Sequence, residues 1–516
     1  MSTRRLAVLA ALLGLALTLP LAAPAAAQAA DQSATDDRGT LRRYAGDTWR
    51  SFELLLDPGT ALPSDNVSAA GERSRYTSPT NVGAYLWSTL AARDAGIISP
   101  SEARKRIAAT LASVARLERH QPSGMFYNWY DPATGAKLTT WPVNGNPVYP
   151  FLSSVDNGWM AAALLMVSNA VPQLRGQARD LLAPMDFGSY YDPAAGLLRG
   201  GFWVDPPGSE CTIPGNYRDP TGPPVLYTCH HYGSLNTEPR IASYLGIAFG
   251  QVPASHYFRM ARTFPPTCDW GWQEQQPAGV TRTYLGVEVF EGHYRYRGMD
   301  IVPSWGGSMF EALMVPLLVP EARWGPRSWG VNHPLYVRAQ IEHGLEEAGY
   351  GYWGFSPSNN PSGGYREYGV DAIGLNPDGY ASNNDNTLVD EGFGDCRPAQ
   401  PLPPPDAWTN GVVTPHASFL ALPYARRAAL DNLAKLRRDF DVYGESGFFD
   451  AVNVDNGQVS RHWLALDQGM VMAALGNELT GDRLQSYLTR GPVERAVRPL
   501  LAMEEFTAVP LGRLVE

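Results

Sequence analysis

The chain has 516 residues, 18% of them charged, and a formal net charge of −10 at pH 7. A surface that follows nucleic-acid phosphates needs clustered lysine and arginine, and the sequence has no such cluster, so we expect no nucleic-acid partner. Aromatic residues make up 11% of the chain. Many of them lie in segments that also contain Gly and Asn, which favours exposed stacking surfaces over core positions alone.

The N-terminus has the features of an export signal. Arg4 and Arg5 precede an apolar run from Leu6 to Ala23, and Ala27-Gln-Ala29 is a small-residue cleavage site. A membrane helix is the alternative, but the run is short, and no later segment reaches the length of a membrane span. We therefore predict a signal peptide over residues 1–29, an N-terminal extension over 30–44, one domain over 45–516, and secretion.

Helical patterns dominate the rest of the chain. Ser99-Pro-Ser-Glu102 is a capping box that predicts a helix burying Ile107 and Leu111. Other predicted helices run from about Thr80 to Gly96 and start near Arg43, Ser153, Arg175, Thr237, Pro253, Gly307, Pro334, Pro415, Pro423, Ala465 and Pro492. Strand signals are few, at Thr281–Val289 and in a hairpin near Phe126–Tyr130. Helical pairs without interleaved strands predict an all-α fold, an (α/α)6 toroid of helical hairpins with long loops at one mouth.

The cysteines predict disulfides. All four, at positions 211, 229, 268 and 396, lie in irregular segments of a chain that we expect to be exported. A Cys211–Cys229 bond would close a local loop and leave Cys268 to pair with Cys396, although three pairings are formally open. Zinc is the rival interpretation, but the chain has no C-x-x-C spacing. The proline-rich stretch Arg397–Asp406 is interpreted as a surface loop within one domain.

The segment Tyr350–Gly369 combines six aromatic rings with glycines and short polar residues. Gly and Pro interrupt helices and central strands, so the segment predicts a loop. Such a loop presents either apolar faces and hydrogen-bonding groups to a sugar ring, or rings that only fill a core. Gly349–Gly354 matches the G-x-G-x-x-G pattern, but it lacks the strand before and the helix after that a dinucleotide site requires.

Several carboxylates stand at predicted helix starts beside Trp, Tyr and Gly. They include Asp156, Glu238 and Glu311, and Asp371 and Asp450 have similar neighbours. A negative charge at a helix N-terminus also serves as a cap, which is the alternative for Asp156 and Glu238. Acids gathered at helix ends fit carbohydrate cleavage, in which one carboxylic acid protonates the leaving oxygen and a second group activates water.

A cofactor is not expected. The acidic run Asn383–Glu391, with Asp395, has oxygen ligands suited to calcium. However, Asp390 stands where an EF-hand loop requires glycine, and a solvated acidic loop is the alternative. We predict no metal at the site.

Motifs spread along residues 45–480 share the order found in a known family. They are Thr77-Ser-Pro-Thr-Asn-Val-Gly83, Phe126-Tyr-Asn-Trp-Tyr-Asp131, Ser154-Val-Asp-Asn-Gly158, Trp353-Gly-Phe-Ser356, Gly364-Tyr-Arg-Glu-Tyr-Gly369, Val413-Thr-Pro-His-Ala-Ser418, Gly447-Phe-Phe-Asp-Ala-Val-Asn453 and Leu466-Asp-Gln-Gly469. The chain thereby resembles the glycoamylase-like domain of bacterial β-1,2-glucan enzymes, and within it glycoside hydrolase family 144, the endo-β-1,2-glucanases.

The resemblance implies an (α/α)6 toroid, inverting hydrolysis, an acid at Glu238 and a cleft carboxylate at Asp156. Two positions depart from the family pattern. Pro357 stands where retaining relatives have a nucleophilic glutamate, and Asn359 stands where hydrolases of the group tend to have an aspartate. An asparagine cannot act as a base at neutral pH.

We therefore predict a secreted, monomeric, inverting glycoside hydrolase of an extracellular β-glucan, β-1,2-linked, with a glycan as its partner. The alternatives are a hydrolase of another polysaccharide, a polysaccharide lyase using His230-His231-Tyr232 and Asn359, and a non-catalytic glycan-binding protein. The predicted catalytic residues are Glu238, Asp156 and Glu311. The predicted substrate-binding residues are Trp159, Arg240, Trp305, Tyr352, Trp353, Asn359, Tyr365, Asp371 and Asp450.

Overall fold

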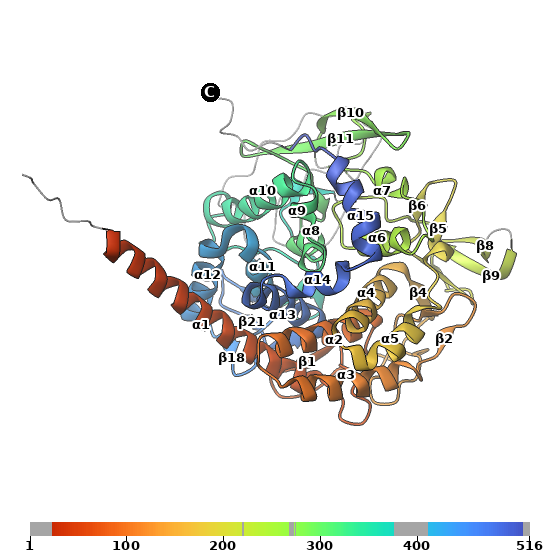
Figure 1. Cartoon of the computed structure of the whole chain (residues 1–516), viewed down its shortest axis with the longest axis horizontal. Helices are drawn as coiled ribbons and strands as arrows, with labels where there is room; N and C mark the ends of the chain where they lie inside the picture. Colours follow the sequence, from red (N-terminus) through yellow and green to blue (C-terminus); the bar gives the residue numbers. More distant parts are fainter. Residues whose placement is uncertain (1–22, 219–220, 268–272, 274, 376–410, 509–516) are drawn as a thin grey trace, which may run out of the picture.

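The computed structural model describes residues 23–218, 221–267, 273, 275–375 and 411–508, and the side chains of its first helix from residue 37 onward. Helices form most of the regular structure (Figure 1). They are α1 (Ala23–Leu55), α2 (Pro79–Asp94), α3 (Pro100–Val114), α4 (Ser154–Ala170), α5 (Arg175–Leu182), α6 (Arg240–Ala248), α7 (His256–Arg259), α8 (Met309–Leu313), α9 (Glu321–Trp324), α10 (Trp329–Glu342), α11 (Pro415–Leu420), α12 (Leu422–Asp439), α13 (Ala465–Thr480), α14 (Arg483–Thr489) and α15 (Pro492–Met503).

Serine caps start the helices that carry or support the site. The Ser99 hydroxyl accepts the N–H of Glu102, as the capping box predicts, and Ser153 and Ser308 cap α4 and α8 in the same way. The predicted helix near Thr237 begins three residues later, at Arg240. The one predicted near Pro334 begins at Trp329, which leaves Pro334 inside α10.

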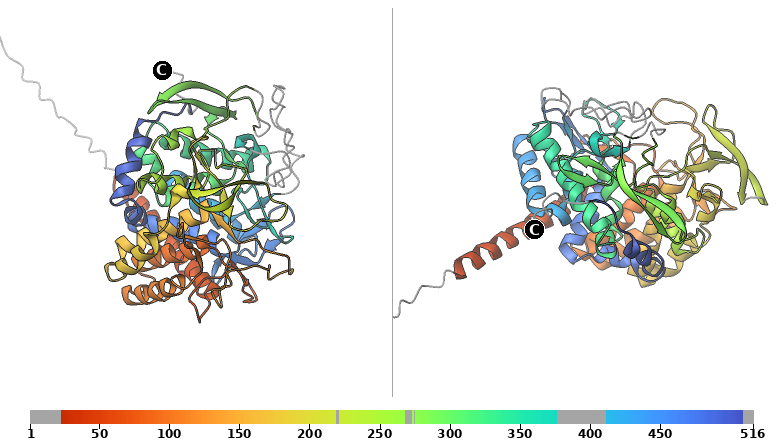
Figure 2. Two further views of the ribbon diagram at one scale, coloured as in Figure 1. Left: turned by 90° about the vertical axis from the view of Figure 1, so that its right-hand side faces the viewer. Right: turned by 90° about the horizontal axis from the view of Figure 1, so that it is seen from above.

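The most buried helices pack side by side around the centre. α13 contacts α2, α2 contacts α4, and α4 contacts α6, while α8 contacts α11 and α11 contacts α13 (Figures 1 and 2). Helices α3, α5, α12 and α15 lie against this inner set from outside. Glycines permit the close approaches, since a Cβ added at Gly469 would lie 2.7 Å from Ala84 and one at Gly158 would lie 3.0 Å from Ala242.

The expectation of an all-α fold is wrong in detail, because the described residues also form nine small sheets. The strands are β1 (Asn66–Ser68), β2 (Arg119–His120), β3 (Met125–Phe126), β4 (Phe151–Ser153), β5 (Tyr191–Asp192), β6 (Leu197–Leu198), β7 (Gly201–Trp203), β8 (Thr212–Arg218), β9 (Thr221–Thr228), β10 (Ala278–Tyr284), β11 (Val287–Tyr296), β12 (Met299–Ile301), β13 (Ser304–Trp305), β14 (Ser358–Asn359), β15 (Tyr365–Arg366), β16 (Gly374–Leu375), β17 (Val412–Val413), β18 (Tyr443–Gly444), β19 (Gly447–Phe448), β20 (Ala451–Asn453), β21 (Val459–Ser460) and β22 (His462–Leu464).

The longer strands lie in loops between helices. Strands β4, β7, β9 and β8 form a four-stranded sheet. The single strand predicted at Thr281–Val289 is a hairpin instead, since β10 and β11 meet across a turn in which Leu285 and Gly286 have positive φ. This hairpin lies at one edge of the molecule (Figures 1 and 2). Most other strands have two or three residues, too few for a periodic sequence pattern.

The Cys211–Cys229 disulfide is present, joining the residue before β8 to the residue after β9. Cys268, Cys396, the acidic run 383–391, Asp395 and the proline-rich stretch 397–406 lie outside the described residues. Helix α1 includes the predicted cleavage segment, and its side chains enter the core from Leu41 on. Within the described part of the chain, no helix is both long and apolar enough to cross a membrane.

Candidate active site

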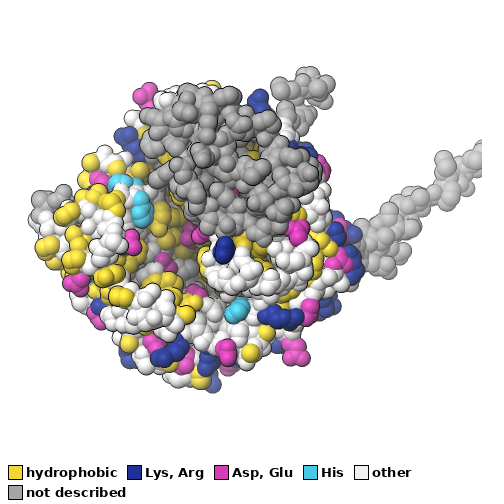
Figure 3. Space-filling model, turned by 180° about the vertical axis from the view of Figure 1, so that it is seen from behind, with side chains coloured by type: hydrophobic (Ala, Val, Ile, Leu, Met, Phe, Trp, Pro, Cys, Tyr) yellow, Lys and Arg dark blue, Asp and Glu magenta, His cyan; other side chains and the backbone are white. Residues whose placement is uncertain are grey.

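A cavity of about 720 Å³ brings together three carboxylates predicted from the sequence. Asp156 lies in the first turn of α4, Glu238 lies two residues before α6, and Glu311 lies in α8; all three line this cavity. One face of the molecule is hollowed, and acidic side chains lie within the hollow (Figure 3). Segments that are far apart in sequence thus place their carboxylates in one cleft.

Glu238 and Glu311 contact each other directly. The backbone N–H of Glu238 donates to Oε2 of Glu311 at 2.8 Å, and the Trp159 indole N–H donates to Oε2 of Glu238 at 2.6 Å. Burial, together with the negative charge of Glu311, raises the pKa of Glu238 well above its usual value. Burial also raises the pKa of Glu311 to about 8. Both carboxyl groups therefore favour the protonated form at neutral pH.

Asp156 has a different environment. Burial raises its pKa, but hydrogen bonds oppose that shift. The Thr80 hydroxyl donates to Oδ1 at 2.6 Å, and the Asn128 amide nitrogen donates to Oδ2 at 2.7 Å. Donors on both oxygens stabilise the charged form of a carboxyl group. Asp156 therefore does more than cap α4: its carboxylate is held within the cavity by side chains from other segments.

A second cavity, of about 620 Å³, also has Glu238 and Glu311 in its lining. Its wall includes His230, His231 and Tyr232, which follow β9, and Trp305 from β13. Nε2 of His231 lies 2.9 Å from Oδ2 of Asp192, which also binds Arg199. The two carboxyl groups therefore stand where the two cavities meet, with room for a ligand on either side.

A group of three aromatic rings lines the first cavity. Tyr76 lies 4.5 Å from Trp141 and 5.6 Å from Trp129 between ring centroids, and the two tryptophans are 5.3 Å apart. None of the three was among the predicted site residues, although Trp129 lies in the Phe126–Asp131 motif. Amphipathic rings beside polar groups provide a surface on which a sugar face can stack.

The aromatic loop at residues 350–369 contributes less than we expected. Tyr365 and Asn359 line the first cavity from the β15 and β14 strands, which pair with each other. Trp353 is buried in the core, and its backbone binds Asn432. The Tyr352 hydroxyl donates to Asp439 at 2.7 Å on the surface. Trp353 and Tyr352, which we predicted to bind substrate, line neither cavity, because this part of the loop packs against α12.

Four further residues predicted to bind substrate lie outside the linings of both cavities. Arg240 is fully buried and forms an ion pair with Glu321, and it lines neither of the two cavities. Asp371 is buried and also absent from both linings. Asp450 is buried one layer below the cavity, where its Oδ2 accepts the N–H of Asn359 at 2.6 Å. Trp159 is likewise buried and reaches the site only through Glu238.

Glu367 is a carboxylate that sequence reasoning missed. It lines the first cavity, and its negative charge helps to raise the pKa of Glu238 and Glu311. The motif Gly364–Gly369 was part of the family resemblance and contains this glutamate, so the motif could have identified it. With Asp65, which sequence reasoning also missed, the carboxylates of the cavity wall are Asp65, Asp156, Glu238, Glu311 and Glu367.

A buried cluster of His416, Asp450 and Asp467 lies behind the cavity, with potential ligand atoms within 4.8 Å of one another. Both imidazole nitrogens of His416 already bind hydroxyl groups, those of Thr414 and Ser356. Burial raises the pKa of Asp450 to about 6 and that of Asp467 well above its usual value. A proton shared between the carboxyl groups of Asp450 and Asp467 explains why both pKa values are raised.

Comparison with known proteins supports the class of fold. Residues 279–489 match the family described as "Putative glucoamylase", which confirms the resemblance drawn from the motifs, and residues 43–190 match a family of unknown function, DUF3131. The cyclic β-(1,2)-glucan synthase NdvB of Rhizobium meliloti is 24% identical over 91% of this chain. The chain spans only 19% of that synthase.

Solved structures share the fold at low sequence identity. A glucoamylase-like protein of Bacteroides fragilis, described as putative, superposes with a TM-score of 0.60 at 19% identity, covering 90% of this chain and 96% of that one. An endo-β-1,2-glucanase of Chitinophaga pinensis, bound to sophorotriose and glucose, gives 0.58 at 17% identity, covering 90% and 98%. A mutant of the endo-β-1,2-glucanase of Talaromyces funiculosus, bound to β-1,2-glucan, gives a TM-score of 0.59 at 13% identity, covering 91% of this chain and 90% of that one.

Proposed function

We propose that this protein is a secreted glycoside hydrolase that cleaves β-1,2-glucan within the chain, with inversion of configuration. The observation that carries the proposal is the position of Glu238 and Glu311 between two cavities, with their pKa values raised by burial. A glycosidic bond lying across these groups would have sugar units on both sides. The solved β-1,2-glucanases of the same fold support the choice of substrate.

Glu238 is assigned as the general acid. Its raised pKa keeps a proton on the carboxyl group, and the bond from Trp159 holds Oε2 in place. As the glycosidic bond breaks, the proton passes to the leaving oxygen, and Glu238 becomes a carboxylate. The Trp159 N–H then stabilises that negative charge through a charge-assisted hydrogen bond. Glu311 holds the backbone of Glu238 in position.

Asp156 is assigned as the general base, because Thr80 and Asn128 stabilise its ionised form. It takes a proton from the water that attacks the anomeric carbon from the face opposite the leaving group, which inverts the configuration. Of the other carboxylates of the cavity, Asp65 and Glu367, we take Glu367 as the second candidate to receive this proton. The same scheme proposes a single catalytic domain over residues 45–516 with the (α/α)6 toroid as its frame, acting as a monomer.

The cavity linings favour hydrolysis over a lyase reaction. A lyase that acts on uronates needs a positive or amide group to neutralise the carboxylate; the described residues lining the two cavities include amides such as Asn359, but neither Lys nor Arg. Five acidic residues line the first cavity, and those that are ionised would instead repel a uronate. Neutral glucan carries no charge and meets no such repulsion.

A panel of glycans tests the proposal. The protein is incubated with linear β-1,2-glucan, with β-1,3- and β-1,4-glucans and with a uronate polymer, and products are resolved by size, ultraviolet absorbance and anomeric configuration. We expect short β-1,2-oligosaccharides whose new reducing ends are initially α-anomers. Initial β-anomers would contradict inversion, ultraviolet-absorbing products would indicate a lyase, and binding without products would indicate a non-catalytic protein.

The roles of the carboxylates are separated by two variants. Glu238→Gln should lose at least about 10³-fold in kcat on β-1,2-glucan, yet retain activity on a substrate whose leaving group needs no proton, such as a glycosyl fluoride. Asp156→Asn should lose activity on both substrates, because water activation is needed for each. If Glu367→Gln behaves in this way and Asp156→Asn does not, the base is Glu367.

A further inference from the structure

Two segments carry the paired carboxyl groups, and one buried side chain holds both. Arg240, the first residue of α6, is fully buried. Its Nη1 donates to the C=O of Thr237 at 2.7 Å and to the C=O of Glu311 at 3.0 Å. Its Nη2 donates to the C=O of Ala312 at 2.8 Å. The guanidinium thus joins the turn before Glu238 to α8, which carries Glu311.

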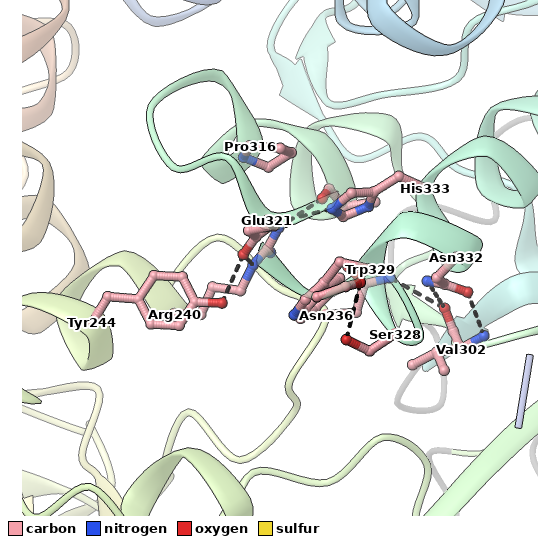
Figure 4. A network of polar contacts seen from close by, with 12 residues as sticks. Asn236, Arg240, Tyr244, Val302, Pro316, Glu321, Ser328, Trp329, Asn332 and His333 are labelled. Atoms are coloured by element: carbon pink, nitrogen blue, oxygen red, sulfur yellow. Dashed lines mark hydrogen bonds and ion pairs between the residues drawn. The ribbon is translucent and has the colours of Figure 1, made fainter. Parts of the chain in front are cut away.

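Arg240 is itself held by an anchor on its other side. Glu321, at the start of α9, accepts from Arg240 Nε at 2.7 Å and from Nη2 at 3.0 Å (Figure 4). The Tyr244 hydroxyl and Nε2 of His333 bind the same carboxylate. Burial alone would raise the pKa of Glu321, but the charge of Arg240 outweighs burial and lowers this pKa to about 2. The anchor therefore stays ionised throughout the working pH range.

All three nitrogens of the Arg240 guanidinium donate hydrogen bonds in this arrangement. The Trp329 ring covers the guanidinium, with its centroid 4.8 Å from Cζ of Arg240. A planar fork with fixed donor directions is needed to reach three carbonyls and both oxygens of one carboxylate, which lysine cannot do. The positive charge of Arg240 also acts on Glu311, since it is one of the influences that lower the pKa of that carboxyl group.

We infer that Arg240 is a positioning residue for the reaction: it sets the spacing of the Glu238 and Glu311 segments and tunes the proton affinity of their carboxyl pair. This inference rests on the proposed function, because it assigns Glu238 as the acid. An error of about 1 Å in such a site costs on the order of 10²-fold in rate. The effect is expected in kcat, since Arg240 lines neither of the two cavities that would hold substrate.

The chain contains a matched control for a purely structural role. Arg262 is also fully buried, pairs with Glu504, donates to the C=O of Met260, and has a tyrosine, Tyr257, bound to its carboxylate partner. Arg262 and Glu504 line neither cavity, and within the described part of the chain their hydrogen bonds do not reach the segments that carry Glu238 and Glu311. Substitutions at Arg240 and Arg262 therefore disturb similar buried ion pairs. Of the two arginines, only Arg240 binds the segments that carry Glu238 and Glu311.

The experiment compares Arg240→Lys, Arg240→Met, Arg262→Lys and Glu238→Gln on linear β-1,2-glucan, with melting temperature, kcat, KM and the pH profile measured for each. We expect Arg240→Lys to lower kcat about 10- to 100-fold, with KM changed less than about threefold. In Arg240→Met the loss of positive charge should move the alkaline limb of the profile to higher pH, because the carboxyl pair then holds its proton more tightly. Arg262→Lys should keep kcat within about twofold.

The outcomes separate the two claims. If Glu238→Gln retains full activity, the proposed function fails. If Glu238→Gln is inactive while Arg240→Lys keeps kcat, or if kcat falls equally in Arg240→Lys and Arg262→Lys, the positioning role is overturned. Should the Arg240 variants not fold, Glu321→Gln tests the same arrangement, because it preserves shape and weakens the anchor. It should lower kcat at least about fivefold with the pH profile displaced, whereas Glu504→Gln should not.

Discussion

At the scale of single residues, environment gives chemically similar carboxyl groups different roles. Glu238 accepts one indole N–H and lies against Glu311, so burial and like charge favour its protonated form. Asp156 has donors on both of its oxygens, and these favour its ionised form. Burial raises the pKa of Asp156 as well, but its hydrogen-bond donors oppose that shift, whereas the charge of Glu311 adds to the shift at Glu238. This difference in surroundings is the basis of the proposed acid and base assignments.

The raised pKa of Glu311 has a cost in stability that depends on pH. The pKa is about 8 in the folded protein, against about 4.3 in an unfolded chain. Between these values the folded protein holds a proton that the unfolded chain has released, so the free energy of unfolding falls as the pH rises. Glu311→Gln should remove this loss, with a gain on the order of a few kcal/mol by about pH 8.

Chemical denaturation at several pH values between about 5 and 8 measures this effect. The advantage of Glu311→Gln over the parent should grow steadily with pH, and the exposed Glu72→Gln serves as the control, with no such trend. A stability difference that stays constant across the range would show that Glu311 does not carry the bound proton.

At the scale of elements, the inner helices depend on glycines for their close packing. A Cβ at Gly469 of α13 would lie 2.7 Å from the Cβ of Ala84 in α2. Contacts under 3.0 Å force one of the two helices to move, since both positions lie on rigid, buried segments. Helix α4, which carries Asp156, is the next neighbour of α2, so this packing also positions the cavity wall.

Gly469→Ala is therefore expected to destabilise the protein by about 1–3 kcal/mol. Gly176, in the outer helix α5, is the matched control, because an added Cβ there meets nothing within 4 Å. Gly176→Ala should stabilise by about 0.5–1 kcal/mol through helix propensity and unfolded-state entropy. Urea denaturation measures both. A loss of stability at Gly176, or none at Gly469, would contradict this account of the packing.

At the scale of the whole molecule, two cavities of about 720 and 620 Å³ meet at the paired carboxyl groups. Helices α4 and α8 and the turn before α6 supply three of the acids, and strands and loops form further walls, including the β14–β15 hairpin and the segment after β9. A long substrate fits this arrangement better than a short one, because only a long chain reaches sugar-binding surfaces in both cavities.

Turnover should therefore rise with oligosaccharide length until both cavities are filled. Trp141→Ala should raise KM for long β-1,2-glucan about 5- to 50-fold through loss of stacking worth about 1–2 kcal/mol, with a smaller effect on short oligosaccharides. Tyr149→Ala is the control, since Tyr149 is an exposed aromatic side chain outside both linings. Equal KM changes for short and long substrates would place Trp141 outside the substrate path.

The sequence by itself determined the features that depend on neighbouring residues. Capping serines, helix periodicity and the spacing of Cys211 and Cys229 are local, and the structure has the helices and the disulfide that they predict. The carboxylates Asp156, Glu238 and Glu311 were picked out because each stands at a predicted helix start among aromatic residues, and the structure has all three in the lining of one cavity. For the aromatic loop at residues 350–369 we expected more substrate contacts than the cavity linings contain. A ring that stacks on a sugar and a ring that fills a core can have the same local sequence, so the sequence does not distinguish them.

Only the tertiary structure decided which side chains face the cavity. Packing against α12 buries Trp353, and the contact with Glu321 turns Arg240 inward. Tyr76, Trp129 and Trp141 meet only because the chain returns to one place, and Glu367 reaches the acids from a hairpin more than a hundred residues away from Glu238. Burial, and with it the pKa of each carboxyl group, is a property of the assembled neighbours, which no local pattern in the sequence encodes.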